Sequence, residues 1–269
     1  NENNLKESEI YDSVLDILSD AVSVRKISDV PIGVFLSGGI DSSTNAVLFS
    51  KDETNPINTF SIGYDKDYST YNNELHHAKF MADRVASNHF EKILSIDDVM
   101  SFIPKMIHLQ DEPIGDPVCI PIYYVSKLAK DNNVTVCQVG EGADEIFGGY
   151  SIWKEWIRLQ NVLNSFAGNH IKFLGKRLLQ ISGNSHHRAF DILDRSDKNR
   201  PAFRGGAEGL TSHEKRLVFS SKYKNLYNSY DEFNCIEPIW NKFNSLSKDK
   251  SPLSWMSYLD LKLRLPELL

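Results

Sequence analysis

Short apolar segments alternate with longer amphipathic segments between residues 30 and 150, and this alternation constrains the fold more than any other feature. The short segments predict strands at 33–36, 58–62, 89–94 and 134–139. The segments around them carry apolar residues at helical spacing and predict helices at 8–27, 42–51, 73–86, 97–109 and 121–130. Strands separated by helices predict an α/β fold with a doubly wound, mostly parallel sheet, because parallel strands need crossover connections.

The pattern changes after Tyr150. Residues 151–181 are apolar at helical intervals, residues 182–209 are polar and interrupted by glycine and proline, and helical spacing resumes near Ser212 and over 252–263. We therefore expect an α/β core over residues 1–150 and a helical part of the same domain over residues 151–269.

Composition excludes several classes of protein. The chain has 269 residues and a net charge of −6, so it carries no dominant basic surface and nucleic acid is not an expected partner. No apolar run approaches the roughly 20 residues of a membrane span. Cys119, Cys137 and Cys235 are widely spaced and lack the pairing of zinc sites or disulfide frameworks. These features predict a protein of the reducing cytoplasm.

The first glycine-rich segment follows a predicted strand directly. Residues 33–43 read Gly-Val-Phe-Leu-Ser-Gly-Gly-Ile-Asp-Ser-Ser. Glycines let the backbone approach an anion, and the N-terminus of the following helix favours negative charge. Asp41 could hold the Mg²⁺ of a nucleotide. The segment is not a Walker A loop, because no Gly-Lys-Ser/Thr follows the glycines. The hydroxyls of Ser37, Ser42 and Ser43 could add hydrogen-bond donors to the phosphate site. The alternative interpretation is a Gly-Gly turn followed by a helix cap, with no bound phosphate.

The second glycine-rich segment, residues 140–150, reads Gly-Glu-Gly-Ala-Asp-Glu-Ile-Phe-Gly-Gly-Tyr and also follows a predicted strand. A helix favours acidic residues in its first turn, which explains Asp144 and Glu145 but not Glu141. Asp144 could share Mg²⁺ with Asp41, and Glu141 could position or deprotonate an attacking amine. Ligands of parallel sheets bind outside the carboxyl ends of the strands, so we expect both segments at one edge.

The residues of the first segment resemble the signature of the ATP pyrophosphatase (PP-loop) enzymes. These enzymes cleave ATP to AMP and pyrophosphate and adenylate an acceptor. Both segments together, with residues 60–63, 111–113 and 259–261, resemble the synthetase domain of glutamine-hydrolysing asparagine synthetases over nearly the whole chain. The resemblance implies an adenine nucleotide α-hydrolase-like fold. It also implies that aspartate is adenylated with ATP and Mg²⁺ and that ammonia then converts it to asparagine.

The resemblance also implies roles for individual residues. Catalysis would involve Glu141, Asp144 and Asp41, and Mg²⁺ would be bound by Asp41 and Asp144. Family members often carry serine at the position of Val139 in this chain. The residues implied in binding ATP or pyrophosphate are Leu36, Ser37, Gly38, Gly39, Asp41, Ser42, Ser43, Ile62, Val139 and Gly140.

The resemblance also implies partners. A glutaminase domain or subunit would supply ammonia, and we expect the chain to be a piece of a longer protein that lacks this domain. A second copy of the chain, in a homodimer, is a further possible partner. Glu74 could contact Mg²⁺ or merely start a helix, and Asp111 and Glu112 could meet a substrate amino group or form a turn.

Other functions remain open from the sequence. β-Lactam synthetases, peptide-cyclising enzymes and sugar-modifying amidotransferases share the adenylation chemistry with other acceptors. A non-catalytic ATP-binding module would keep the fold without turnover. A P-loop kinase would release ADP in place of AMP.

Overall fold

The computed structural model describes residues 6–66, 74–110, 117–185, 187–206, 210, 212–226 and 231–268. The chain forms two compact units, Asn1–Glu141 and Gly142–Leu269. The division comes before residue 150 because helix α6 (Ala143–Phe147) packs against helix α13 (Pro252–Lys262), which belongs to the second unit.

The first unit is built on a four-stranded sheet. Its strands are β1 (Ile32–Phe35), β2 (Asn58–Tyr64), β3 (Asn88–Leu94) and β4 (Val136–Gln138), in the order β3–β2–β1–β4. Every pairing is parallel, and Val34 of β1 lies between Thr59 of β2 and Gln138 of β4. The predicted parallel α/β fold is thus confirmed.

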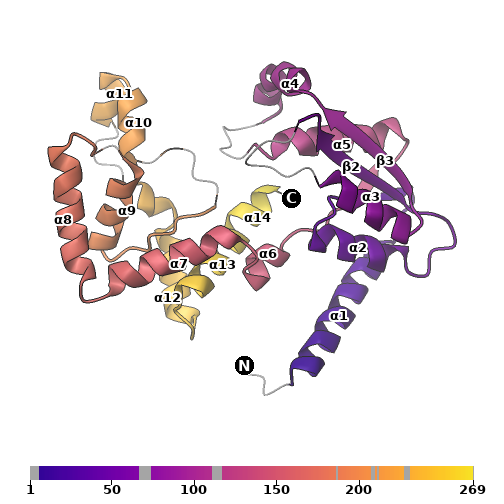
Figure 1. The fold of residues 1–269 in the computed structure, drawn as a ribbon, viewed down its shortest axis with the longest axis horizontal. Coiled ribbons are helices and arrows are strands. Elements are labelled where there is room, and N and C mark those ends of the chain that lie inside the picture. The colour runs from indigo at the N-terminus through magenta and orange to yellow at the C-terminus, as the bar shows by residue number, and fades with distance from the viewer. Residues whose placement is uncertain are drawn as a thin grey trace. The chain divides into compact units, whose positions relative to one another are not determined.

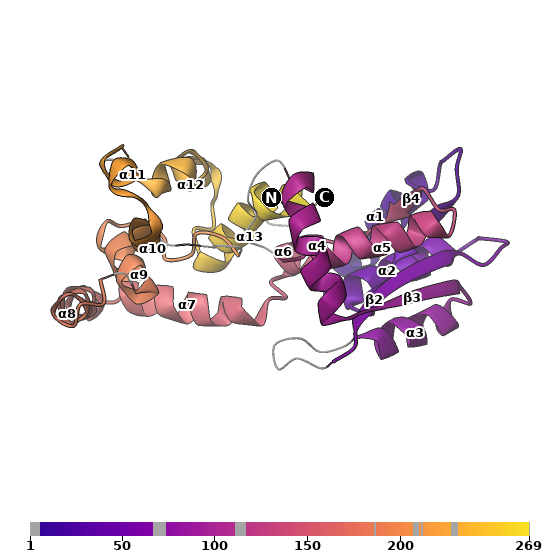
Figure 2. The same cartoon turned by 90° about the horizontal axis from the view of Figure 1, so that it is seen from above.

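Helices cover both faces of this sheet, as Figure 2 shows for α3 and α5. On one face, α2 (Ile40–Ser50), α3 (Leu75–Arg84) and the end of α1 (Glu7–Val24) enclose the buried side chains of Val34 and Leu36. On the other face, α5 (Cys119–Asp131) packs on Phe60, and α4 (Ile96–Leu109) packs beside α5. Strands that are buried on both faces explain the continuous apolar runs in the sequence.

The strand order reverses between β1 and β4. The chain moves outward from β1 through β2 to β3, and then returns to the other side of β1 to form β4. Doubly wound sheets bind ligands at such a switch point, outside the carboxyl ends of the two diverging strands. The first glycine-rich segment and the start of the second follow β1 and β4 at this point.

The second unit is helical, as predicted for the later part of the chain. In Figure 1, α7 (Ser151–Asn164) leads into α8 (Gly168–Ile181), and α9 (Arg188–Asp197) lies alongside α8. Its core contains Trp153, Phe203, Phe243 and Trp255. The other helices are α10 (Ser212–Val218), α11 (Ser221–Leu226), the 3₁₀ helix η1 (Glu232–Cys235), α12 (Glu237–Leu246) and α14 (Arg264–Leu268).

Three features of this unit go beyond the sequence expectations. The segment 151–181, which is apolar at helical intervals, forms two helices, because the chain turns between α7 and α8. The polar stretch 182–209 contains the helix α9. Its amphipathic pattern is short, and the nearby Gly183 and Pro201 make the whole stretch look like a loop in the sequence. Helix α12 was not predicted either. None of the described helices has the length and apolar content needed to cross a bilayer.

Candidate functional site

The loop between β1 and α2 is held by two serine hydroxyls. Ser37 Oγ and Ser42 Oγ lie 2.9 Å apart within hydrogen-bonding distance, and the Ser37 amide donates to Ser42 Oγ at 3.1 Å. The Gly39 amide donates to Ser37 Oγ at 3.2 Å. Two of the predicted phosphate-binding hydroxyls therefore shape the loop, and Ser37 is also exposed at its surface.

Gly38 brings this loop against the first part of α3. Its φ of +89° lies in the left-handed region that favours glycine. A Cβ atom at this position would lie 2.6 Å from the amide nitrogen of Ala78 and 2.7 Å from His77 Cβ. The position therefore requires glycine for both conformation and space. The exposed His77 was not anticipated as a neighbour of the loop.

Gly140 brings the end of β4 against the first turn of α2. A Cβ atom on Gly140 would lie 2.6 Å from the carbonyl oxygen of Asp41 and 2.9 Å from Ser42 Cα. The start of the second glycine-rich segment therefore meets the first one at the switch point, as the parallel sheet predicts. A side chain at residue 140 would push these two segments apart.

The N-terminus of α2 is suited to an anion. Gly39, its N-cap residue, has an extended backbone, and no side chain caps the helix. The helix begins at Ile40 and not at the predicted Ser42, because Gly39 ends the turn before it. The first amides of a helix have no partner within it, and the helix dipole favours negative charge there. This terminus can therefore bind phosphate oxygens.

Asp41 lies in the first turn of α2 and is partly exposed. A carboxylate beside an anion site is favourable when a divalent cation lies between the two negative groups. Mg²⁺ suits such a position, since it uses one or two carboxylates together with substrate phosphates. Within the described residues, no group of three or more His, Cys, Asp or Glu side chains forms a metal cage.

The other predicted phosphate donor, Ser43, has a different environment. Its Oγ is buried and has no hydrogen-bond partner in the described part of the chain. Leaving a buried hydroxyl unsatisfied costs about 1–3 kcal/mol. The fold therefore tolerates an unused donor one turn into α2, and its role towards phosphate stays a prediction.

The residues implied for adenosine do not share one surface. The Leu36 side chain is buried with α2 and α3, and its amide donates to the Phe60 carbonyl at 2.9 Å. Ile62 is half-buried on the opposite face, near α5. Val139 is exposed immediately after β4. Glu74 is the N-cap residue of α3, and Asp111 and Glu112 lie outside the described residues.

The second glycine-rich segment continues into the second unit, where it contains the short helix α6 between two glycines. Gly142 and Gly148 flank this helix with φ values of +102° and +70°. The amides of Gly148 and Gly149 donate to the Asp144 carbonyl at 2.9 and 3.1 Å. A Cβ atom on Gly149 would overlap Asp144 Oδ1, so this glycine makes room for the carboxylate. Asp144 is exposed, and so is Glu141 at the end of the first unit.

A buried polar cluster supports this segment, and sequence reasoning missed it. Glu145 is 2% exposed and accepts a hydrogen bond of 2.7 Å from the Tyr150 hydroxyl. The Arg264 guanidinium lies 5.0 Å from the centre of the Tyr150 ring. Asp260 is fully buried, and this burial raises its pKa to about 6, while Arg264 opposes the rise. Burial and the bond to Glu145 also raise the pKa of Tyr150.

The sequence held one signal for this cluster. Asp260 occurs among Trp255, Met256 and Leu259, which are apolar at helical spacing, so a carboxylate there lies on the core side of α13. A buried carboxylate requires nearby polar partners. Arg264 follows only four residues later, but the Gly206 backbone and Glu145 come from distant parts of the chain, which is why the local pattern did not reveal the cluster.

The first unit thus has an open helix N-terminus at the switch point of a parallel sheet, an arrangement typical of α/β proteins that bind phosphorylated ligands. Residues 13–269 match the model of the asparagine synthase family. The chain therefore belongs to this family.

Individual relatives agree with this assignment. The chain is 40% identical over 259 residues to asparagine synthetase [glutamine-hydrolyzing] 1 of Bacillus subtilis, which covers 95% of the chain and 38% of that protein. It is 40% identical over 135 residues to a putative asparagine synthetase [glutamine-hydrolyzing] 2 of Methanocaldococcus jannaschii, covering 50% of the chain and 25% of that protein. The chain spans well under half the length of these relatives.

A solved structure is also similar to the chain. It is the NH3-dependent NAD synthetase of Campylobacter jejuni, with 14% sequence identity and a TM-score of 0.33. The match covers 87% of the chain and 97% of that protein.

Proposed function

We propose that this protein is an ATP-dependent amide-forming ligase that converts aspartate to asparagine. In the proposed reaction, an oxygen of the aspartate side-chain carboxylate attacks the α-phosphorus of ATP and pyrophosphate leaves. Ammonia then attacks the acyl carbon of β-aspartyl-AMP, AMP leaves, and a proton passes to a base. The proposal is supported by family membership, by the names of the relatives, and most directly by the open N-terminus of α2 at the switch point.

The first proposed task of the chain is to hold pyrophosphate. The amides at the start of α2 would bind its oxygens, because they point out of the helix without a capping side chain. Gly38 and Gly39 would let the loop approach the phosphates closely, and Ser37 would add a hydroxyl donor from an exposed position. Ser42 and Ser43 are proposed to complete the donor set.

The second proposed task is to manage charge. We propose that Asp41 and Asp144 ligate Mg²⁺, which neutralises charge on the leaving pyrophosphate when bound. The Asp41 carboxylate fits this role because it lies in the first turn of α2. The Asp144 carboxylate fits it because it is exposed and the absence of a side chain on Gly149 leaves room for it. Without a bound cation, both carboxylates would repel the negatively charged pyrophosphate.

The third proposed task concerns the acyl group and the base. Glu141 is an exposed carboxylate just after β4, and we propose that it orients ammonia or accepts its proton. Leu36 and Ile62 would line the adenosine site with backbone and apolar contacts, and Val139 and Gly140 would lie near the AMP. Ammonia would come from a glutaminase domain or subunit, as the names of the relatives suggest.

The test is pyrophosphate release with Mg-ATP and ammonium chloride, which removes the need for a glutaminase. Reactions contain aspartate, glutamate, another carboxylate or no acceptor. Release that requires aspartate and falls by about 100-fold or more in Asp41→Asn supports the proposal. Equal release with every acceptor, release of ADP in place of AMP, or no release despite ATP binding would each contradict it.

A further inference from the structure

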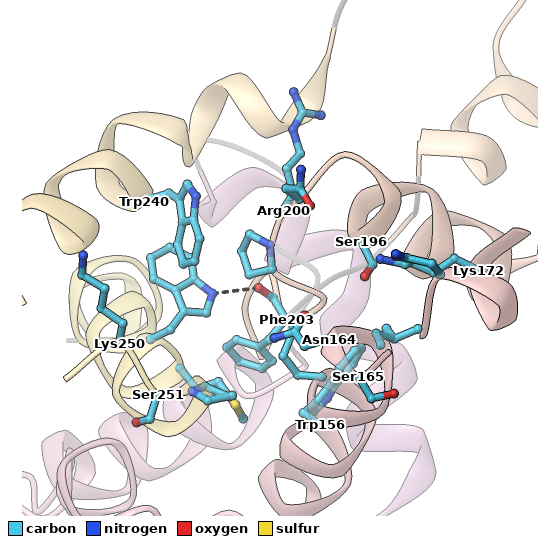
Figure 3. Close-up of a pocket in the computed structure, with 18 of the residues that line it drawn as sticks. Trp156, Asn164, Ser165, Lys172, Ser196, Arg200, Phe203, Trp240, Lys250 and Ser251 are labelled. Carbon is cyan, nitrogen blue, oxygen red and sulfur yellow. Dashed lines mark hydrogen bonds between the residues drawn. The ribbon is translucent and has the colours of Figure 1, made fainter. Parts of the chain in front are cut away.

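The second unit contains a cavity of about 420 Å³ that none of the predicted site residues lines. Its walls come from α7, the start of α8, the end of α9, the segment around Pro201, α12 and the start of α13. Figure 3 shows Trp240 and Lys250 on one side of the cavity and Lys172 and Ser196 on the other. Every lining residue belongs to the second unit, so the cavity can be considered apart from the nucleotide loop.

Aromatic rings form part of the wall, beside amide and hydroxyl side chains such as Asn164 and Ser196. Trp156 packs edge-on against Phe203 with ring centres 5.8 Å apart, and Trp240 packs edge-on against Trp255 at 4.7 Å. The Trp255 indole nitrogen donates to the Phe203 carbonyl at 3.1 Å, which is the dashed line in Figure 3. These contacts fix the rings, while Trp156 and Trp240 remain partly exposed. Flat, rigid walls of this kind suit a flat apolar ligand.

The charged groups of the lining have one sign. Among the described residues that line the cavity, Lys172, Arg200 and Lys250 are charged and none is Asp or Glu. Arg200 is already paired, because its Nη1 lies 2.6 Å from Asp231 Oδ2. An anion inside the cavity would therefore meet positive charge that is only partly compensated by the protein.

Lys172 is the decisive residue. Only 7% of the residue is exposed, and its Nζ, which keeps some accessible surface, makes no hydrogen bond or ion pair with the described part of the chain. Lys176, one turn further along α8, gives the contrast: its Nζ lies 2.8 Å from Asp194 Oδ1 and 2.9 Å from Asp197 Oδ2. The fold supplies α9 carboxylates to one lysine and directs the other into the cavity. An ammonium on a largely buried residue, with no partner in the described part of the chain, is poorly compensated, and a bound anion would compensate it.

We propose that this cavity binds a small organic carboxylate with a flat apolar body. The single ammonium of Lys172, which has no partner in the described part of the chain, matches one carboxylate, and the tryptophan and phenylalanine rings of the lining match the apolar body. Because none of the described lining residues is acidic, a ligand that also carries an ammonium group, such as aspartate, would meet only neutral acceptors there, such as Asn164 and Ser196. The ligand is therefore of a different class from the amino-acid substrate of the proposed ligase.

The first test uses the unmodified protein. Calorimetry and tryptophan fluorescence measure the binding of 1-naphthoate, of the neutral isostere 1-naphthamide and of the zwitterion tryptophan, with 1-naphthyl phosphate as a second anion. We expect saturable binding of naphthoate, at least tenfold tighter than that of naphthamide or tryptophan. Tighter binding of the phosphate would change the anion class and overturn the carboxylate assignment. Equal binding of naphthoate and naphthamide, or no saturable binding, would overturn the proposal.

The second test uses variants. Lys172→Met keeps the length of the side chain and removes its charge, and it should weaken naphthoate at least tenfold while leaving naphthamide unchanged. Lys172→Arg should restore most of the affinity. Lys154→Met, which changes an exposed lysine of α7 outside the cavity, is the control and should bind like the unmodified protein. An equal loss in the control, or no loss in Lys172→Met, would contradict the proposal. If Lys172→Met does not fold, the comparison of naphthoate with naphthamide decides.

Discussion

The two glycine-rich segments have similar composition but use glycine for different physical purposes. In the first segment, Gly38 turns the loop against α3, and the helix that follows is left without a side-chain cap. In the second, Gly142 and Gly148 close both ends of α6, and Gly149 makes space for the Asp144 carboxylate. The first segment thus leaves backbone donors open to an anion, and the second leaves space for an exposed acidic side chain.

This difference shows how chemistry can be divided between backbone and side chain. Backbone amides at a helix N-terminus can bind an anion whatever the side chains of those residues are, provided that the loop geometry is kept. A carboxylate has to be placed individually, so its neighbours must be shaped around it. Substitutions that add a single methyl group should therefore damage the two segments in different ways.

The largest expected effect is on folding, at Gly38. Gly38→Ala combines a left-handed backbone with a collision against the backbone of α3, and we expect a loss of about 4 kcal/mol in the free energy of unfolding. Chemical denaturation measures it. Gly39→Ala is the matched control, because its Cβ would meet only Ser37 Oγ, at 3.3 Å. Equal stability of the two variants would show that the loop does not depend on its contact with α3.

The next effect concerns the buried cluster under the second segment. Burial raises the pKa of Asp260 to about 6, above its value in the unfolded chain, so the folded state binds more protons between pH 4 and pH 6. Stability should therefore fall as the pH rises through this window, by about 3 kcal/mol at most. Asp260→Asn should remove that slope in denaturation curves measured from pH 4 to pH 7.

An exposed carboxylate of the same unit provides the control for this pH dependence. Hydrogen bonds from Ser254 and Ser251 lower the pKa of Asp249, so its contribution to stability is lost as the pH falls. Asp249→Asn should leave the slope between pH 4 and pH 6 in place. If Asp260→Asn also left it unchanged, Asp260 would not be the group that titrates there.

A smaller effect on stability, with a clear effect on activity, is expected at Gly149. Gly149→Ala overlaps the end of the Asp144 side chain, which can move, so the free energy of unfolding should change by less than about 1 kcal/mol. Pyrophosphate release should fall by up to about 100-fold, because the carboxylate is displaced. In an Asp144→Asn background, Gly149→Ala should have no further effect on the rate, whereas additive losses would indicate that Gly149 acts independently of Asp144.

The mildest comparison of the two units uses their cysteines. Burial raises the pKa of the Cys137 thiol in β4 to about 11, whereas Cys235 in the second unit is exposed. We expect iodoacetamide to label Cys235 at least about tenfold faster than Cys137 at pH 8, because the thiolate is the reacting form. Peptide mass spectrometry measures both rates, and faster labelling of Cys137 would mean that β4 opens readily.

Much of the first unit could be predicted because its signals are local. The strands at 33–36 and 58–62 and the helices around them follow from periodicity, and the parallel order then brings the two glycine-rich segments to one edge. The start of α2 was predicted two residues too late, because the extended backbone of Gly39, and not the type of the following residues, determines where the helix begins.

The parts that could not be predicted depend on contacts between distant residues. Arg264 is only four residues from Asp260, but Tyr150 and Glu145 are distant in sequence, and only the fold brings them to this pair. Lys172 resembles any helical lysine in the sequence, and its burial depends on the packing of α8 in the second unit. The proposed roles of Glu141 and Asp144 rest on family resemblance and on their exposed positions, and they remain predictions.

The most direct test of the proposed chemistry follows an oxygen atom. Aspartate labelled with ¹⁸O in its side-chain carboxylate is incubated with Mg-ATP, ammonium chloride and the protein, and AMP is analysed by mass spectrometry. Attack of the carboxylate on the α-phosphorus predicts one ¹⁸O in each AMP formed with asparagine, and loss of this product in Asp41→Asn. Unlabelled AMP, or ¹⁸O in inorganic phosphate, would contradict adenylation at the loop between β1 and α2.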